Sequence, residues 1–124
     1  MKLSQLVAQE DFIQRMDEEL LKLMEFDFQY TEVKYAGCSY TGPAMLDYCQ
    51  VGPDCKGCIF GTALQNLGWD PSEKIPEGAY IKGLIDWAGG AAPGRWTNIQ
   101  NAQDKGANWK DLKGYMHDVV QEPT

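Results

Sequence analysis

Four cysteines, Cys38, Cys49, Cys55 and Cys58, lie within a short central stretch of this chain and are its only cysteines. Four thiolates can close a tetrahedral zinc site, and the Cys55-x-x-Cys58 spacing is typical of one half of such a site. Cys38 and Cys49 are much farther apart than the two to four residues that usually separate a ligand pair. The cluster therefore leaves three interpretations open, which are a structural zinc site, a reactive thiol site and a mixture of buried and surface thiols.

The length of the chain indicates that it does not need those cysteines in order to fold. Its 124 residues predict a single domain, 1–124, in which 121–124 form a frayed tail. A chain of this size buries roughly two-thirds of its unfolded surface, which suffices without a metal or a disulfide. No apolar run is long enough to cross a bilayer, and the N-terminus turns polar too early for a signal peptide. We therefore expect a cytoplasmic protein with reduced thiols and no membrane partner.

The charge of the chain restricts the classes of partner that it can bind. The formal net charge is −7, and two arginines accompany nine lysines. Direct nucleic-acid binding is not expected, because neutralising phosphates requires a basic face. Acidic residues are concentrated between Glu10 and Lys34, where eight acidic side chains face three basic ones. This stretch is either the solvated face of a helix or an acidic docking surface, for which Glu18 and Glu25 are the candidate residues.

Apolar spacing predicts a mainly α, compact single domain of about five helices. The predicted helices cover about 11–26, 57–67, 76–88 and 95–105, and a last one begins near 108. Ser4 could open an earlier turn. Residues 28–35 predict a short extended or β segment, and 36–57 an irregular loop that carries cysteines. Gly68 and Gly106 are expected to end the second and fourth helices.

The same spacing predicts which side chains face the core. On the first helix these are Phe12, Ile13, Met16, Leu20, Leu23 and Met24, and the acids are expected on the opposite face. The second helix is apolar nearly all round, so it should be the central buried helix. The third helix should face inward with Tyr80, Ile81, Leu84, Ile85 and Ala88. The last should do so with Trp109, Leu112, Met116, Val119 and Val120.

Two stretches look familiar. Cys58–Gly68 follows a Cys-hydrophobic-x-Gly-x-Ala-Leu-x-x-Leu-Gly pattern, and Ile99–Trp109 contains a Gln-x-x-Gln-Asp-x-Gly-x-x-Trp pattern. Together they resemble small uncharacterised proteins of actinobacteria and their phages. The matched segments cover about a fifth of the chain, within an order of elements that spans residues 38 to 115. The resemblance implies an actinobacterial or phage source and brings no activity with it.

Both stretches also have a structural interpretation that is independent of the resemblance. Cys58 would be a small apolar filler, which is common for a buried cysteine. Gln103 and Asp104 can accept hydrogen bonds from backbone amides at the turn and at the start of the last helix. Trp109 would anchor that helix, with its indole N–H directed at a buried acceptor.

Catalytic motifs are missing from the sequence. His117 is the only histidine available as a base for a cysteine nucleophile, and it lies on the predicted last helix. No nucleophile elbow, zinc-protease or Walker motif occurs. A redox role for Cys55 and Cys58 would require the pair to follow a strand within a βαβ unit, and nothing in the sequence predicts that unit. We name no catalytic residues, and the sequence favours a protein that is not an enzyme without deciding the question.

One turn could bind a small ligand. Residues 52–57 bring Lys56 and backbone amides to the start of the second helix, which is a favourable position for an anion. Tyr40 and Tyr48 could add a stacking wall for a nucleotide-like molecule. The alternative is an ordinary capped turn with surface tyrosines.

We therefore expect a non-enzymatic, cytoplasmic accessory protein, encoded by a phage, that binds a host protein in host takeover or counter-defence. Its surface would be the acidic first helix or the tyrosine-bearing loop. A small-molecule-binding or sequestering module that uses the Cys55–Gly57 turn is the alternative. A domain stabilised by structural zinc on Cys38, Cys49, Cys55 and Cys58 is compatible with both.

Overall fold

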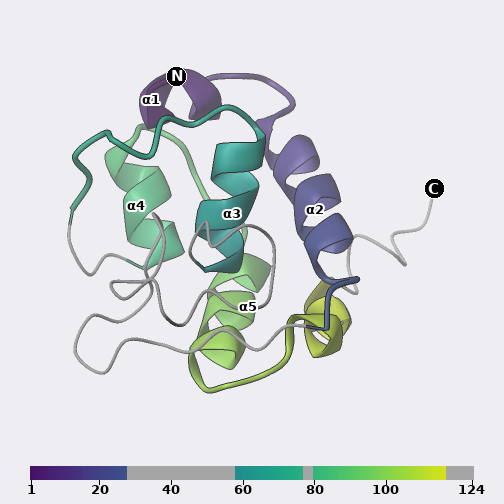
Figure 1. The fold of residues 1–124 in the computed structure, drawn as a ribbon. Helices are drawn as coiled ribbons and strands as arrows, with labels where there is room; N and C mark the ends of the chain where they lie inside the picture. The colour runs from purple at the N-terminus through teal and green to yellow at the C-terminus, as the bar shows by residue number, and fades with distance from the viewer. Residues whose placement is uncertain (28–57, 77–79, 117–124) are drawn as a thin grey trace.

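The computed structural model describes residues 1–27, 58–76 and 80–116, which are coloured in Figure 1. The described residues are mainly helical and contain no strand, which confirms the predicted mainly α class. The helices are α1 (Leu3–Val7), α2 (Phe12–Leu23), α3 (Ile59–Asn66), α4 (Ile81–Trp87), α5 (Gly94–Asp104) and the 3-10 helix η2 (Trp109–Met116). The predicted extended segment, the cysteine-bearing loop, the inward positions Val119 and Val120 and the frayed tail lie outside the described residues.

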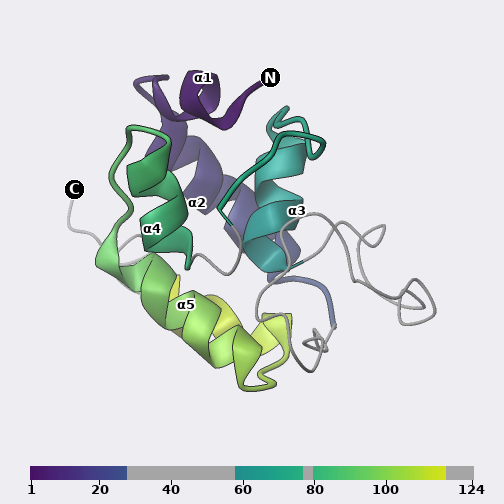
Figure 2. The same cartoon turned by 90° about the vertical axis from the view of Figure 1, so that its left-hand side faces the viewer.

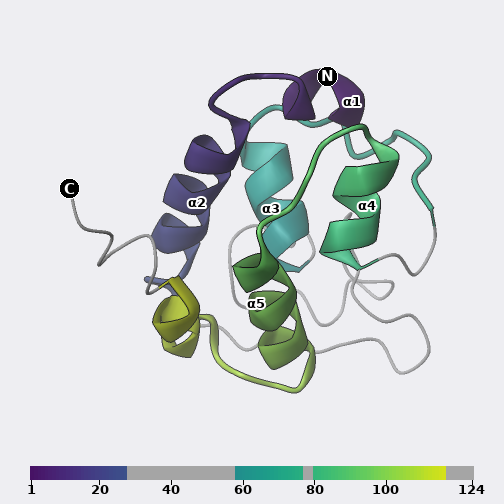
Figure 3. The ribbon, with the colours of Figure 1, turned by 180° about the vertical axis from the view of Figure 1, so that it is seen from behind.

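Helix α3 lies at the centre of the arrangement, between α2 and α4 (Figures 1 and 3). Helix α5 lies at the end of the molecule opposite to α1, as the side view confirms (Figure 2). Helix α2 packs on α3 and η2, and α5 packs on α3, α4 and η2. The largest fully buried side chains are Trp96, Trp109 and Phe60. Trp96 packs edge-on against Phe12 from α2, with ring centroids 5.9 Å apart, and thus joins α5 to α2.

The apolar face predicted for α2 is confirmed, with one exception. Five of its six expected core residues are buried, whereas Ile13 is 37% exposed. The prediction that the acids share the opposite face is wrong for Asp17, which is only 4% exposed. The carboxylate of Asp17 accepts the indole N–H of Trp96 at 2.9 Å and forms an ion pair with Arg95. A partner from α5 therefore holds this acid inside the protein.

Helix α3 is the central buried helix that its composition predicts. Residues 59–64 are all buried. The helix ends at Gly68, whose φ of +111° lies in the left-handed region that glycine adopts without a steric penalty. The N–H of Gly68 donates to the carbonyl of Gln65, and that of Trp69 donates to Leu64. Gly106, with φ +102°, ends α5 in the same way, so both predicted glycine stops are confirmed.

Helix α4 begins later than the sequence predicts. It starts at Ile81, rather than near Pro76, and ends before Gly89, whose φ is +93°. Ile81, Leu84, Ile85 and Ala88 are buried as expected. The prediction that Tyr80 faces the core is wrong, because this residue is 61% exposed and faces away from the core. Its position before the first residue of the helix explains the difference, since the helical periodicity does not extend to it.

Two buried glutamines on α5 fix the starts of α3 and α4. The side-chain oxygen of Gln103 accepts the backbone N–H of Ile59 at 2.7 Å, and that of Gln100 accepts the N–H of Ile81 at 2.6 Å. Each bond satisfies an amide that a helix leaves unpaired in its first turn. Gln103 also accepts the indole N–H of Trp109 at 3.1 Å, so the buried acceptor expected for that indole is found.

Candidate functional site

The two acidic residues predicted for binding are exposed on α2 and just beyond it. Glu18 lies within the helix, and Glu25 follows its last residue, Leu23, by two positions. Glu18 accepts a hydrogen bond from the Gln14 side chain at 3.2 Å. Glu25, whose side chain is 69% exposed, forms an ion pair with Lys113 of η2. Neither residue is part of the core, and both carboxylates lie on the surface.

The exposed acidic face is smaller than the sequence predicts. Asp17 is buried, and Glu19 accepts a hydrogen bond from Asn66 at 2.9 Å and lies 3.8 Å from Lys22. Within the described residues of this region, the exposed acids are Glu10, Asp11 and Glu18, together with Glu25 and Asp27 just beyond α2, where Asp27 accepts a hydrogen bond from the Asn108 side chain. We call Glu10, Asp11, Glu18 and Glu25 the α2 acidic face.

Cys58 lies at the start of α3, where it is fully buried. Its sulfur accepts the N–H of Gly61 at 3.5 Å, as the side chain of a helix N-cap. Cys58 is disulfide-bonded, and its partner lies outside the described residues. The expectation of a reduced thiol therefore does not hold at this position. Zinc binds thiolates rather than disulfide sulfurs, so a zinc site that uses Cys58 would require the reduced chain.

Several candidate residues lie outside the described part of the chain. These are the remaining metal candidates Cys38, Cys49 and Cys55, the loop residues Tyr40, Tyr48 and Lys56, and His117. The zinc site and the ligand-binding turn stay predictions. Among the residues that the structure describes, no group of three or more His, Cys, Asp or Glu side chains could hold a metal ion. No helix in the described ranges is long and apolar enough to cross a membrane.

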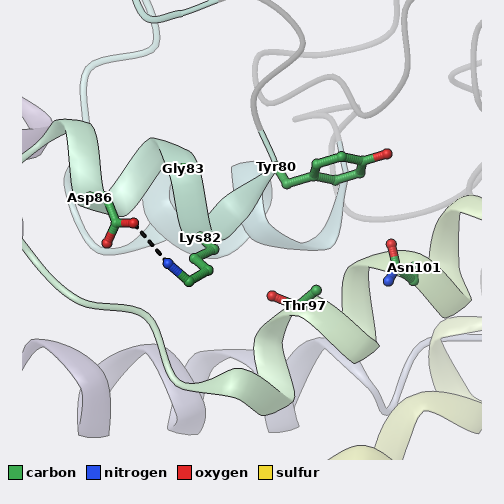
Figure 4. A pocket seen from close by; sticks show the side chains of 6 residues that line it. All are labelled: Tyr80, Lys82, Gly83, Asp86, Thr97 and Asn101. Atoms are coloured by element: carbon green, nitrogen blue, oxygen red, sulfur yellow. Dashed lines mark hydrogen bonds and ion pairs between the residues drawn. The ribbon is translucent and has the colours of Figure 1, made fainter.

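A hollow of about 470 Å³ opens between α4 and α5. The described residues that line it are Tyr80, Lys82, Gly83, Asp86, Thr97 and Asn101 (Figure 4). Tyr80 and Asn101 lie toward one end, the Lys82–Asp86 pair toward the other, and Thr97 between them (Figure 4). The ammonium of Lys82 is 3.0 Å from the Asp86 carboxylate. The hollow thus combines an aromatic ring, an amide, a hydroxyl and a neutralised pair of charges.

Sequence reasoning missed this hollow, although two signals point to it. Gly83 interrupts an otherwise good helical pattern, and Tyr80 lies at the edge of that pattern. The six lining residues come from two helices whose packing has to be known before the side chains can be grouped. The sequence alone therefore shows an unusual glycine on α4, but it does not show that residues of α5 line the other side of the hollow.

Comparisons with known proteins find no match for this chain among family models, curated proteins or solved structures. The resemblance to actinobacterial and phage proteins therefore stays a prediction that rests on Cys58–Gly68 and Ile99–Trp109.

Proposed function

We propose that this protein is a phage-encoded accessory protein that acts in the host cytoplasm by binding a host protein through the α2 acidic face. The observation that carries the proposal is the exposure of Glu18 on α2 and of Glu25 just beyond its end, while the apolar side of the helix is buried in the core. The proposed phage source rests on the resemblance alone.

Charge complementarity defines the partner that this face fits. A net charge of −7 and a face of four acids favour a partner with a lysine- or arginine-rich surface. Complementary charges raise the association rate and select among partners more than they raise the final affinity. Binding through this face should therefore weaken as the salt concentration rises.

Charge reversal tests the proposal. The native chain and the Glu18→Lys/Glu25→Lys variant are immobilised and exposed to an actinobacterial lysate, and captured proteins are identified by mass spectrometry. We expect a partner that the native chain captures and the variant loses. The melting temperature should change little, because Glu18 is exposed and surface pairs such as Glu25–Lys113 contribute only about 0–1 kcal/mol.

A matched reversal elsewhere controls for net charge. Asp86→Lys changes the charge of the chain as much as Glu18→Lys does, but it lies on α4, across α3 from α2 (Figure 1). The partner should bind the Asp86→Lys variant as it binds the native chain, and the Glu18→Lys variant less. Equal capture of the partner by all variants would show that the α2 acidic face does not bind it.

The disulfide at Cys58 gives a separate test of the proposed compartment. Cytoplasmic thiols are normally kept reduced. The protein is produced in a bacterial cytoplasm, treated with an alkylating agent at lysis without reductant, and weighed by mass spectrometry. Four alkylated cysteines would show that the protein keeps reduced thiols in a cytoplasm, as the proposal requires. A protected pair that includes Cys58 would show that the disulfide forms even under reducing conditions, and the expectation of reduced thiols would then be wrong.

A further inference from the structure

We propose that the hollow between α4 and α5 binds a nucleoside, with the base against Tyr80 and Asn101 and the sugar against Thr97 and Asp86. This site uses none of the residues of the α2 acidic face or of the Cys55–Gly57 turn, and its test is independent of the proposed host-protein binding.

Gly83 is the first observation that carries the proposal. Glycine is the least favourable residue after proline within a helix, so its presence there calls for a reason. The backbone gives none, since Gly83 is not among the described glycines with positive φ. Packing gives none either, because a Cβ built on Gly83 meets no atom within 4 Å. The space beside Gly83 is the hollow that it lines, which a larger side chain would partly fill.

The aromatic end of the hollow matches a nucleobase. Tyr80 is 61% exposed and presents a ring that no described aromatic side chain covers. Aromatic side chains bind unpaired bases by stacking on their faces. Asn101 lies across from Tyr80 on α5 (Figure 4). Its carboxamide both donates and accepts, which is how asparagine pairs with the edge of adenine.

The polar end of the hollow matches a sugar better than a phosphate. The carboxylate of Asp86 can accept a hydrogen bond from a sugar hydroxyl, and the hydroxyl of Thr97 can donate or accept one. Lys82 and Asp86 neutralise each other at 3.0 Å, so their charges favour neither a strong anion nor a strong cation. The net charge of −7 adds long-range repulsion against phosphates. A nucleoside therefore fits the hollow better than a nucleotide.

The size of the hollow agrees with such a ligand. Its volume of about 470 Å³ falls in the range of roughly 300–1,000 Å³ that is usual for small-molecule sites. Both walls are helices that the buried core holds in place, since Ile81, Leu84 and Ile85 of α4 and Ile99 of α5 are fully buried. The lining side chains are thus presented by a packed framework.

Nuclear magnetic resonance titration of the full chain with adenosine tests the site, with guanosine, cytidine and uridine as further probes. We expect saturable shifts of the backbone amides of Gly83, Thr97 and Asn101. Gly83→Leu should weaken binding at least tenfold while the melting temperature stays equal or rises, because leucine is the better helix former. Tyr80→Ala should also weaken binding at least tenfold, whereas Tyr115→Ala, at a tyrosine that is 43% exposed on η2, should leave it unchanged.

Three results would overturn the assignment. The first is the lack of saturable shifts at the hollow with any of the four nucleosides at millimolar concentration. The second is binding that survives both Gly83→Leu and Tyr80→Ala as well as it survives Tyr115→Ala. The third is tighter binding of adenosine monophosphate than of adenosine, which would identify the ligand as an anion. The Glu18→Lys variant should bind adenosine like the native chain, so this test is independent of the capture experiment.

Discussion

Helices α2 and α5 are the two longest described helices, with 12 and 11 residues, and they join the core in different ways. Helix α2 packs mainly through apolar side chains that recur along one face. Helix α5 buries Trp96 and Ile99 but also Gln100 and Gln103, whose amide oxygens hold the starts of two other helices. The contrast shows that polar side chains can be as central to a small core as apolar ones, provided that each has its partner.

The variant expected to destabilise the protein most, and thus to test the contribution of buried polar side chains, is Gln103→Leu. The change keeps the approximate volume of the side chain but leaves the N–H of Ile59 and the indole N–H of Trp109 without their acceptor. A buried donor without a partner costs about 1–3 kcal/mol, so two of them should destabilise the protein by about 4 kcal/mol. Urea denaturation measures the loss. Asn98→Leu makes a similar change at an exposed position of the same helix and should have little effect.

The apolar side of the comparison is tested at Leu20, which is fully buried on α2. Leu20→Ala should destabilise the protein by about 3 kcal/mol, from lost burial and from the cavity that remains. Leu20→Met, which nearly conserves volume, should cost less than about 1.5 kcal/mol. If Leu20→Ala proved clearly more damaging than Gln103→Leu in urea denaturation, apolar packing would outweigh the buried amides.

A comparison of the two glutamines sharpens the argument further. Gln100→Leu removes the acceptor for the N–H of Ile81, whereas Gln103→Leu removes the acceptor for two donors. We therefore expect a loss of about 2 kcal/mol for Gln100→Leu, about half that for Gln103→Leu. Thermal or urea denaturation of the two single variants decides the point. Equal losses would mean that the additional bond to the Trp109 indole does not make Gln103 the more important of the two glutamines.

The smallest effect is expected at Asp70, an exposed counterpart of the buried glutamines. Its carboxylate accepts the N–H of Ser72 at 2.9 Å and the hydroxyl of Ser72 at 2.7 Å. The backbone bond, followed by the hydroxyl, lowers the pKa of Asp70 below its ordinary value of 3.8. The resulting stabilisation is present above that value and is lost as the pH falls below it.

Asp70→Asn should therefore lower the melting temperature slightly at neutral pH, and the difference from the native chain should shrink as the pH approaches 3. Melting curves of both proteins over this pH range measure the difference, which isolates Asp70 from the other carboxylates. A gap that stayed constant with pH would show that the charge of Asp70 contributes nothing.

The sequence was sufficient for the parts of the fold that local patterns determine. The apolar face of α2, the buried α3 and the stops at Gly68 and Gly106 all follow from periodicity and backbone preference. The errors occurred where contacts with residues distant in the sequence determine whether a side chain is buried. Asp17 is buried because Arg95 and Trp96 pair with it, and these residues are almost 80 positions away along the chain.

The candidate sites show the same division. The exposure of Glu18 and Glu25 could be predicted, because the apolar spacing of the first helix leaves both outside its buried face, although α2 ends before Glu25. The hollow needed residues from α4 and α5 together, which no single periodicity brings together. Tyr80 was misassigned to the core for a related reason, since its exposure depends on where α4 begins.

The bond between Gln103 and Ile59 also bears on how the protein forms during synthesis. The two residues are 44 positions apart, and the glutamine comes second. While the ribosome is still producing α5, a nascent α3 has no acceptor for that amide and only part of the surface that will cover it. The central helix can therefore reach its final stability only after residue 103 has left the exit tunnel. Until then, α3 can pack on α2 but lacks the cover that α5 gives it in the folded protein.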